Sequence, residues 1–212
     1  MIIGAWNLGK KPPYDAKVEY LGMGSVLGKP YVEIASISSL PSGTVASGDV
    51  VSLAFRARFS KPQNGRNFIA SLGRDSYFHY TEIRNSRIGG YAYGREVAFF
   101  DYSDDYPVGV SMIVSLGSFD CTFDTGGQPN VLHYAEDTTA VFPVTIGALI
   151  GISSYPAATM YLEAATLTVN GTVERKLIPV RKDGVGYMYD VVSGELLGNA
   201  GTGTFTIGPD KS

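Results

Sequence analysis

The sequence has little of three features that indicate a function directly: cysteine, helical periodicity and clustered basic charge. Among 212 residues there is one cysteine, Cys121, so no disulfide can form within the chain and the core must hold the fold. Lysine and arginine are scattered, and the formal net charge is −3. Nucleic-acid binding needs a clustered basic face, so we expect no nucleic-acid partner.

The sequence also lacks a long apolar run and a secretory signal. The longest nearly apolar run, residues 141–152, contains Pro143 and two glycines and is far shorter than the ~20 residues of a membrane-spanning helix. The first 15 residues show no basic start followed by an apolar stretch. We therefore expect no membrane partner and synthesis in the cytoplasm without a signal peptide.

Patterns of β-structure run through most of the chain, and no window shows a clear 3.6-residue apolar period. Glycine and aromatic residues are abundant, which suits turns and pleated surfaces. Residues 50–59 alternate apolar and polar side chains, as in a half-buried strand. Asn170-Gly171 separates two β-type runs and predicts a type I′ hairpin. Together these patterns predict an all-β, two-sheet antiparallel sandwich over residues 16–212, preceded by an N-terminal arm over 1–15.

The two ends of the chain carry motifs in a fixed order. They are Val18-Glu19-Tyr20-Leu21 and Tyr31-Val32-Glu33-Ile34 near the start, and Ile178-Pro179-Val180-Arg181, Gly186, Tyr189-Asp190, Gly194, Asn199-Ala200-Gly201, Gly203 and Phe205 near the end. The pairing resembles concanavalin A-like, laminin-G-like domains, which are common in tail or fibre proteins of phages and prophages and in proteins of gut bacteria. The resemblance covers about a third of the chain, and residues 35–163 share only a general β-rich pattern with the family and none of its motifs. It implies a jelly roll whose first and last segments lie side by side.

The closing stretch, residues 182–203, shows no catalytic signature. Its glycines supply turn conformations that a β-carbon opposes. Asp190 directly follows Tyr189, where its carboxylate can accept backbone N–H groups and fix the turn that follows. We therefore predict that this stretch closes the sandwich edge, and sugar binding by Asp190 and Asn199 is the alternative.

The glucanase branch of this superfamily holds its catalytic carboxylates on one strand face, two residues apart. No Asp or Glu of this chain has another acidic residue two positions later. The two histidines, His79 and His133, are far apart, and no zinc-ligand spacing occurs. The sequence therefore predicts that the chain is not an enzyme. A carbohydrate-active hydrolase whose acid pair comes from different strands is the alternative.

The best candidate site in the sequence is the stretch 89–109. Its tyrosines can stack on the apolar faces of a sugar, and its carboxylates can accept hydrogen bonds from hydroxyl groups. The candidate carbohydrate-binding residues are Tyr91, Tyr93, Asp101, Tyr102, Asp104, Asp105 and Tyr106. Calcium held by Asp101, Asp104 and Asp105 is a weaker alternative, and a solvated acidic turn without a ligand is the plainest interpretation.

The resemblance implies a structural or receptor-binding component of a phage virion, in a tail, a fibre or a capsid decoration, and the candidate site suggests that this component recognises a host-surface glycan. Expected partners are that glycan, other virion proteins and further copies of the chain. A decoration module without any ligand is a further alternative. In that case residues 1–15, with Trp6, would contribute to a large apolar interface.

Overall fold

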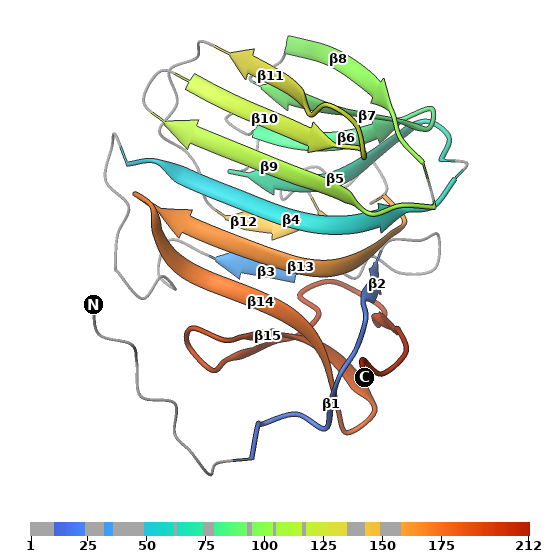
Figure 1. The fold of residues 1–212 in the computed structure, drawn as a ribbon, viewed down its shortest axis with the longest axis vertical. Helices are drawn as coiled ribbons and strands as arrows, with labels where there is room; N and C mark the ends of the chain where they lie inside the picture. The colour runs from blue at the N-terminus through green and yellow to red at the C-terminus, as the bar shows by residue number, and fades with distance from the viewer. Residues whose placement is uncertain are drawn as a thin grey trace.

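The protein is an all-β sandwich of two antiparallel sheets, as predicted (Figure 1). The computed structural model describes residues 11–23, 32–35, 49–61, 63–73, 79–92, 95–103, 105–115, 118–134, 143–148 and 158–212. No helix occurs among these residues. Accordingly, the described part of the chain holds no helix long and apolar enough to cross a membrane.

The larger sheet has eleven strands in the described part of the chain, eight of which follow one another in a continuous path. In path order they are β11 (Asn130–Tyr134), β10 (Ser118–Asp124), β9 (Val108–Ser115), β4 (Val51–Phe59), β13 (Met160–Val169), β14 (Thr172–Lys182), β15 (Val185–Asp190) and β16 (Leu196–Leu197). Three short strands join beside this path: β1 (Ala16–Lys17), β2 (Leu21–Met23) and β17 (Thr206–Ile207).

The smaller sheet has six strands in the described residues and lies behind the larger one in Figure 1. In order they are β3 (Val32–Ala35), β12 (Val144–Ile146), β5 (Arg66–Leu72), β6 (His79–Arg84), β7 (Arg87–Ala92) and β8 (Arg95–Asp101). The sheet combines strands from the start and the middle of the chain, because β12 joins β3 to β5.

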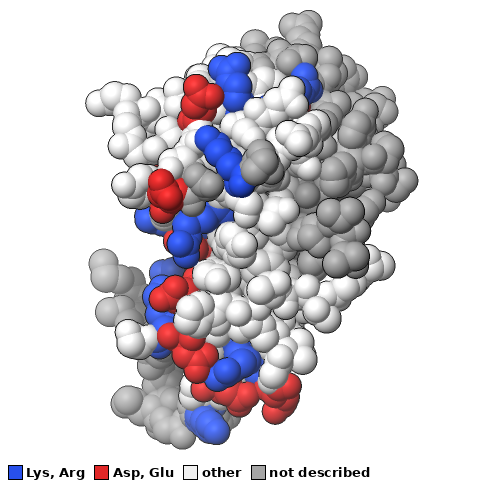
Figure 2. Space-filling view, turned by 90° about the vertical axis from the view of Figure 1, so that its right-hand side faces the viewer, with Lys and Arg blue, Asp and Glu red and all other residues white. Residues whose placement is uncertain are grey.

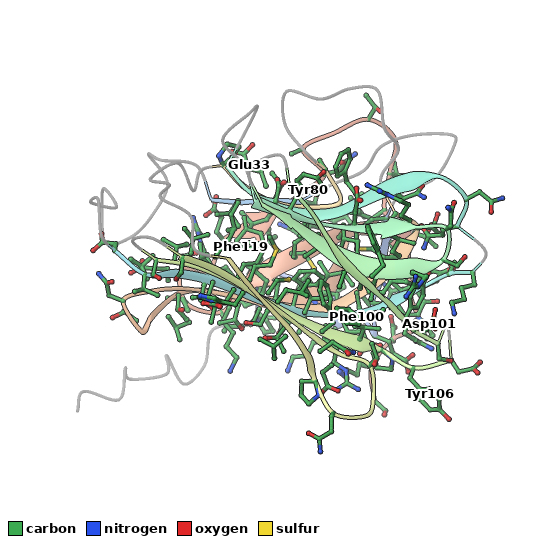
Figure 3. All side chains as sticks on the ribbon, turned by 90° about the horizontal axis from the view of Figure 1, so that it is seen from above. Glu33, Tyr80, Phe100, Asp101, Tyr106 and Phe119 are labelled. Carbon is green, nitrogen blue, oxygen red and sulfur yellow. The ribbon has the colours of Figure 1, made fainter. Side chains whose placement is uncertain are left out.

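The core fills the space between the two sheets. Alternate residues of β4 are buried, which confirms the period-2 pattern of residues 50–59. Phe119 of β10 is fully buried and points between the sheets in Figure 3. Burial of such a side chain contributes about 1.5–3 kcal/mol. Cys121 is also fully buried, and this burial, together with the nearby charge of Asp120, raises the pKa of its thiol, so it is a packing residue and not a nucleophile.

The first and last segments of the chain lie side by side, as the resemblance implied. β1 pairs with β14, β2 pairs with β17, and Val18 forms an isolated bridge with Asp210. The two ends pack so closely here that position 186 of β15 requires glycine, because a Cβ at this position would lie 2.7 Å from Cδ2 of Leu21. The prediction that the closing stretch forms a sandwich edge is confirmed, since β15 and β16 end the strand path of the larger sheet.

The Asn170-Gly171 hairpin is also confirmed. Both residues have positive φ, 49° and 77°, as a type I′ turn requires. The Asn170 side chain fixes the turn further, because its Oδ1 accepts a hydrogen bond from the backbone N–H of Val50 at 2.9 Å and its Nδ2 donates to Oδ1 of Asp49 at 2.7 Å. The turn joins β13 to β14 in the middle of the larger sheet.

Candidate functional site

Tyr102, which the sequence suggested as a sugar platform, is a core residue. Its side chain is 4% exposed, and its ring packs edge-on against Phe59 with centroids 5.9 Å apart. Its hydroxyl donates to the carbonyl oxygen of Ser60 at 3.3 Å. This part of the site prediction is wrong, because the alternation after β8 directs Tyr102 inward and its hydroxyl finds a backbone acceptor there.

The other members of that candidate site whose side chains the structure describes, Asp101, Asp105 and Tyr106, are exposed. Asp101 is exposed and lies 3.4 Å from Nε of Arg87. Asp105 accepts a hydrogen bond from the hydroxyl of Ser103 within its own loop, and Tyr106 is 66% exposed and points away from the sandwich (Figure 3).

The structure does not test the other three members of the candidate site as ligand-binding residues. Tyr91 pairs through its backbone with Tyr80, and Tyr93 and Asp104 lie outside the described residues. Within the described ranges, no group of three acidic, histidine or cysteine side chains comes close enough to hold a metal ion. The calcium prediction stays untested, because Asp104 is not described.

A hollow on the outer face of the larger sheet brings together a different set of residues. It has a volume of about 260 Å³ and lies where β4 ends, beside β2 and the start of β13. Its lining consists of Tyr20, Arg58, Phe59, Ser60, Lys61 and Tyr161. Phe59 is fully buried and forms the floor, and the other five side chains are partly or fully exposed.

Strand geometry explains why charged and aromatic side chains meet here. The alternation of β4 directs Arg56 and Arg58 to the outer face, opposite the buried Ala57. The pairing of β13 with β4 shifts between Leu162 and Ala164, so Glu163 is an extra residue in a β-bulge. The bulge directs Glu163 between the two arginines, with its Oε2 3.2 Å from Nε of Arg56 and its Oε1 3.4 Å from Nε of Arg58.

Two tyrosines flank the hollow. The rings of Tyr20 and Tyr161 meet edge to face, with centroids 4.9 Å apart and an interplanar angle of 67°. The guanidinium carbon of Arg58 lies 5.6 Å from the centroid of Tyr20, within the range of a cation–π contact. One arginine therefore joins the aromatic pair to the charged part of the hollow.

Lys61 supplies a second cation at the rim. Its ammonium group donates to the carbonyl oxygen of Tyr102 and lies 4.5 Å from the centroid of that ring. Tyr102 thus positions a residue of the hollow, although it does not line the hollow itself.

Charge on the neighbouring surface is mixed. Figure 2 shows Lys and Arg interspersed with Asp and Glu along one border of the face in view, with no extended patch of one sign among the described residues. Against this mixed background, the described residues of the hollow and its border combine three cations, Arg56, Arg58 and Lys61, with one carboxylate, that of Glu163.

Sequence reasoning missed this hollow. In the sequence, Tyr20 stands out only as part of the opening motif, and Arg58 is only one polar position of an alternating strand. Tyr161 and Glu163 come from a strand about 100 positions later. The available signal was the pair of arginines on one strand face, but their partner cannot be identified without the pairing of β4 with β13.

Asp190, the alternative sugar-binding residue of the closing stretch, uses its carboxylate for hydrogen bonds within the protein. Its carboxylate is fully buried. Oδ1 accepts hydrogen bonds from the backbone N–H groups of Lys176 and Val192, and Oδ2 accepts hydrogen bonds from Arg175 at 3.0 Å and from the Ser193 hydroxyl at 2.6 Å. Burial by itself would raise the pKa of Asp190, but these hydrogen bonds outweigh it and hold the pKa below its usual value. The predicted role of Asp190 in fixing the turn after Tyr189 is confirmed.

Asn199 is likewise engaged within its own loop. Its Nδ2 donates to the carbonyl oxygen of Gly203 at 2.7 Å, and its Oδ1 accepts from the N–H of Gly201 at 2.8 Å. A second hollow of about 570 Å³ includes Asn199 in its lining, together with five glycines and the side chains of Tyr187, Thr204 and Phe205 among others. It presents no charged side chain among its lining residues, so it has less capacity for directed recognition than the hollow at Arg58.

Comparison with known proteins adds little to this geometry. No protein-family model matches the sequence, and no curated protein matches it. The fold has a likeness to a solved structure, Scytalido-glutamic peptidase with a peptide-based transition state analog. The two chains are 10% identical, the match covers 90% of this chain and 99% of that one, and the TM-score is 0.39.

This comparison corrects the prediction that the chain is not an enzyme. That solved structure is of a peptidase, which is an enzyme. The prediction was wrong because it tested one spacing within one strand, whereas catalytic groups can come from several strands. The likeness is too distant to assign an activity or a catalytic residue to this chain.

Proposed function

We propose that the chain is a receptor-binding or structural component of a phage virion, and that it recognises carbohydrate on a host surface. The observation that carries the recognition role is the hollow at the end of β4, which is lined by the contacting rings of Tyr20 and Tyr161 together with Arg58 and Lys61. The virion assignment is supported by the motifs of residues 18–34 and 164–209, which resemble domains of phage tail and fibre proteins.

The hollow has the groups that sugar binding requires. Sugars present apolar C–H faces, which pack on tyrosine rings, and hydroxyl rims, which exchange hydrogen bonds with polar side chains. Arg58 and Lys61 donate hydrogen bonds, while the hydroxyls of Ser60 and the tyrosines can both donate and accept. The groups belong to three segments of one sheet, so backbone pairing keeps them in place before a ligand arrives.

The position of the hollow also suits a receptor-binding role. It opens on the outer face of the larger sheet, away from the core between the sheets. We therefore expect a glycan attached to a surface to reach it.

The test is a glycan array probed with the purified chain and three variants. We expect the wild-type chain to bind a subset of glycans, and Tyr161→Ala and Arg58→Gln to lose that binding. Tyr106→Ala is the matched control, because it removes an exposed tyrosine that belongs to the loop suggested by the sequence and does not line the hollow. Loss of binding in Tyr106→Ala with retention in Tyr161→Ala would move the site to that loop. If the wild-type chain binds no glycan on the array, the proposed recognition role is overturned.

A further inference from the structure

We infer that the hollow at the end of β4 selects sugars that carry a carboxylate, such as a terminal uronic or sialic acid. This inference rests on the proposed carbohydrate recognition and names the ligand class of that same site. It follows from the charge balance of the hollow, from the incomplete pairing of Arg58 and from the small volume available.

The first ground is an excess of positive charge. Arg56 and Arg58 share the single carboxylate of Glu163, and no acidic partner of Lys61 occurs in the described part of the chain. A neutral sugar would leave this excess charge uncompensated. A carboxylate placed between Arg58 and Lys61 would compensate it and accept hydrogen bonds from both.

The second ground is that Glu163 engages the two arginines unequally. Nε of Arg56 donates a hydrogen bond to Oε2 of Glu163 at 3.2 Å. Nε of Arg58 is buried, lies 3.4 Å from Oε1 and makes no hydrogen bond with any described residue. The guanidinium carbon of Arg58 lies over the ring of Tyr20, 5.6 Å from its centroid, and its other N–H groups remain available for a ligand.

The third ground is size. The hollow has a volume of about 260 Å³, below the roughly 300–1,000 Å³ of sites for drug-sized ligands. It therefore suits one terminal sugar unit rather than an extended chain. Arg58, Lys61 and Tyr161 line the same hollow, so we expect the carboxylate of a single unit to bind the cations while its ring packs on Tyr161.

Glu163 acts in this site as an internal competitor. Its carboxylate occupies one side of Arg58, so it opposes the approach of a second anion to that side. Glu163→Gln keeps the size and the hydrogen-bonding oxygen of the side chain but removes the charge. We expect this variant to bind an acidic sugar more tightly, by roughly two- to fivefold, as for other exposed charge pairs.

The experiment is titration calorimetry with matched probes: methyl glucuronide, its methyl ester, methyl glucoside and methyl sialoside. We expect binding of at least one acid and none of the ester or the neutral glucoside, with affinity that falls as salt rises. Arg58→Gln should weaken the affinity for the acidic sugar by about tenfold or more, since it removes a charge-assisted hydrogen bond. Arg87→Gln is the control, because it removes another exposed arginine, paired with Asp101 outside the hollow, and should leave affinity unchanged.

The outcomes separate the two proposals. If acidic and neutral sugars bind with equal affinity, and Tyr161→Ala abolishes both, the selection of a carboxylate is overturned. Carbohydrate recognition at the hollow would then still be supported. Weaker acid binding in Glu163→Gln would also overturn the inference, because it would make Glu163 a ligand-binding group. If none of these probes binds and the glycan array is silent, both proposals are overturned.

Discussion

Two regions of this protein use arginine and carboxylate in opposite ways. In the closing segment, Arg175 has a side chain that is 5% exposed, and one of its Nη atoms donates to Asp190, Ser193 and Glu195. In the outer hollow, the side chain of Arg58 is 36% exposed and makes one loose ion pair. The same residue type is therefore part of the framework in one place and available to a ligand in the other.

Burial explains the difference. A charge removed from water must be compensated by fixed partners within the protein, or the fold does not form. Asp190 and Arg175 meet this requirement, and the hydrogen bonds of Glu195 and Asp190 raise the pKa of Arg175 against the effect of burial. At the outer face the side chain of Arg58 is 36% exposed, so its exposed N–H groups can bind water in the free protein and a ligand in its place.

The largest effect that tests this comparison is expected from Asp190→Ala. The change leaves the buried Arg175 without its buried partner and removes several hydrogen bonds, so we expect a loss of about 3–5 kcal/mol in the free energy of unfolding. Urea denaturation measures it, with Asp190→Asn as the milder variant. Arg58→Gln is the counterpart in the hollow and should change stability by less than about 1 kcal/mol. Similar losses in both would erase the distinction between the regions.

A smaller effect is expected from tightening the closing segment at Gly186. Gly186→Ala places a Cβ 2.7 Å from Cδ2 of Leu21, so the overpacked segment should lose about 1–3 kcal/mol of stability. Gly127→Ala is the control, because a Cβ there meets no atom within 4 Å and that glycine has no positive φ. A neutral result at Gly186 would show that the two ends of the chain pack loosely.

The pH dependence of stability should also distinguish the regions. The pKa of Asp190 is lower in the folded protein than in the unfolded chain, so the unfolded chain binds the proton first as pH falls. Its stabilising contribution is therefore complete above the ordinary aspartate pKa of about 4 and is lost below it, as pH falls through the lowered folded pKa. Thermal melts from pH 6 to pH 2 should show a smaller acid-induced decline in Asp190→Asn than in wild type. Parallel declines would contradict a lowered pKa.

The smallest effect is expected on the outer face. Arg56 is 62% exposed, so solvent screens its ion pair with Glu163, and Arg56→Gln should change the free energy of unfolding by no more than about 0.5 kcal/mol. Denaturation at low and high salt measures this. A loss above 1 kcal/mol would mean that the arginines of the outer face belong to the framework after all.

Much of the fold could be predicted from local patterns. The alternation of residues 50–59 marks β4, Asn170-Gly171 marks the β13–β14 turn, and the position of Asp190 marks the turn that it fixes. Each of these depends on neighbours in sequence, which is why residue order was sufficient. The assignment of Tyr102 to a sugar site failed for the converse reason: its inward direction depends on Phe59 and Ser60, which lie about 40 positions earlier.

The sequence by itself determined the class of fold, the turns and the residue that holds the closing segment, because period-2 alternation and turn chemistry act within a few residues. Tertiary structure alone decided which polar side chains meet on one surface. The hollow depends on the pairing of β4 with β13 and on the bulge that directs Glu163 between Arg56 and Arg58. Strand pairing between distant segments is set by the packing of the whole core, so no local pattern can specify it.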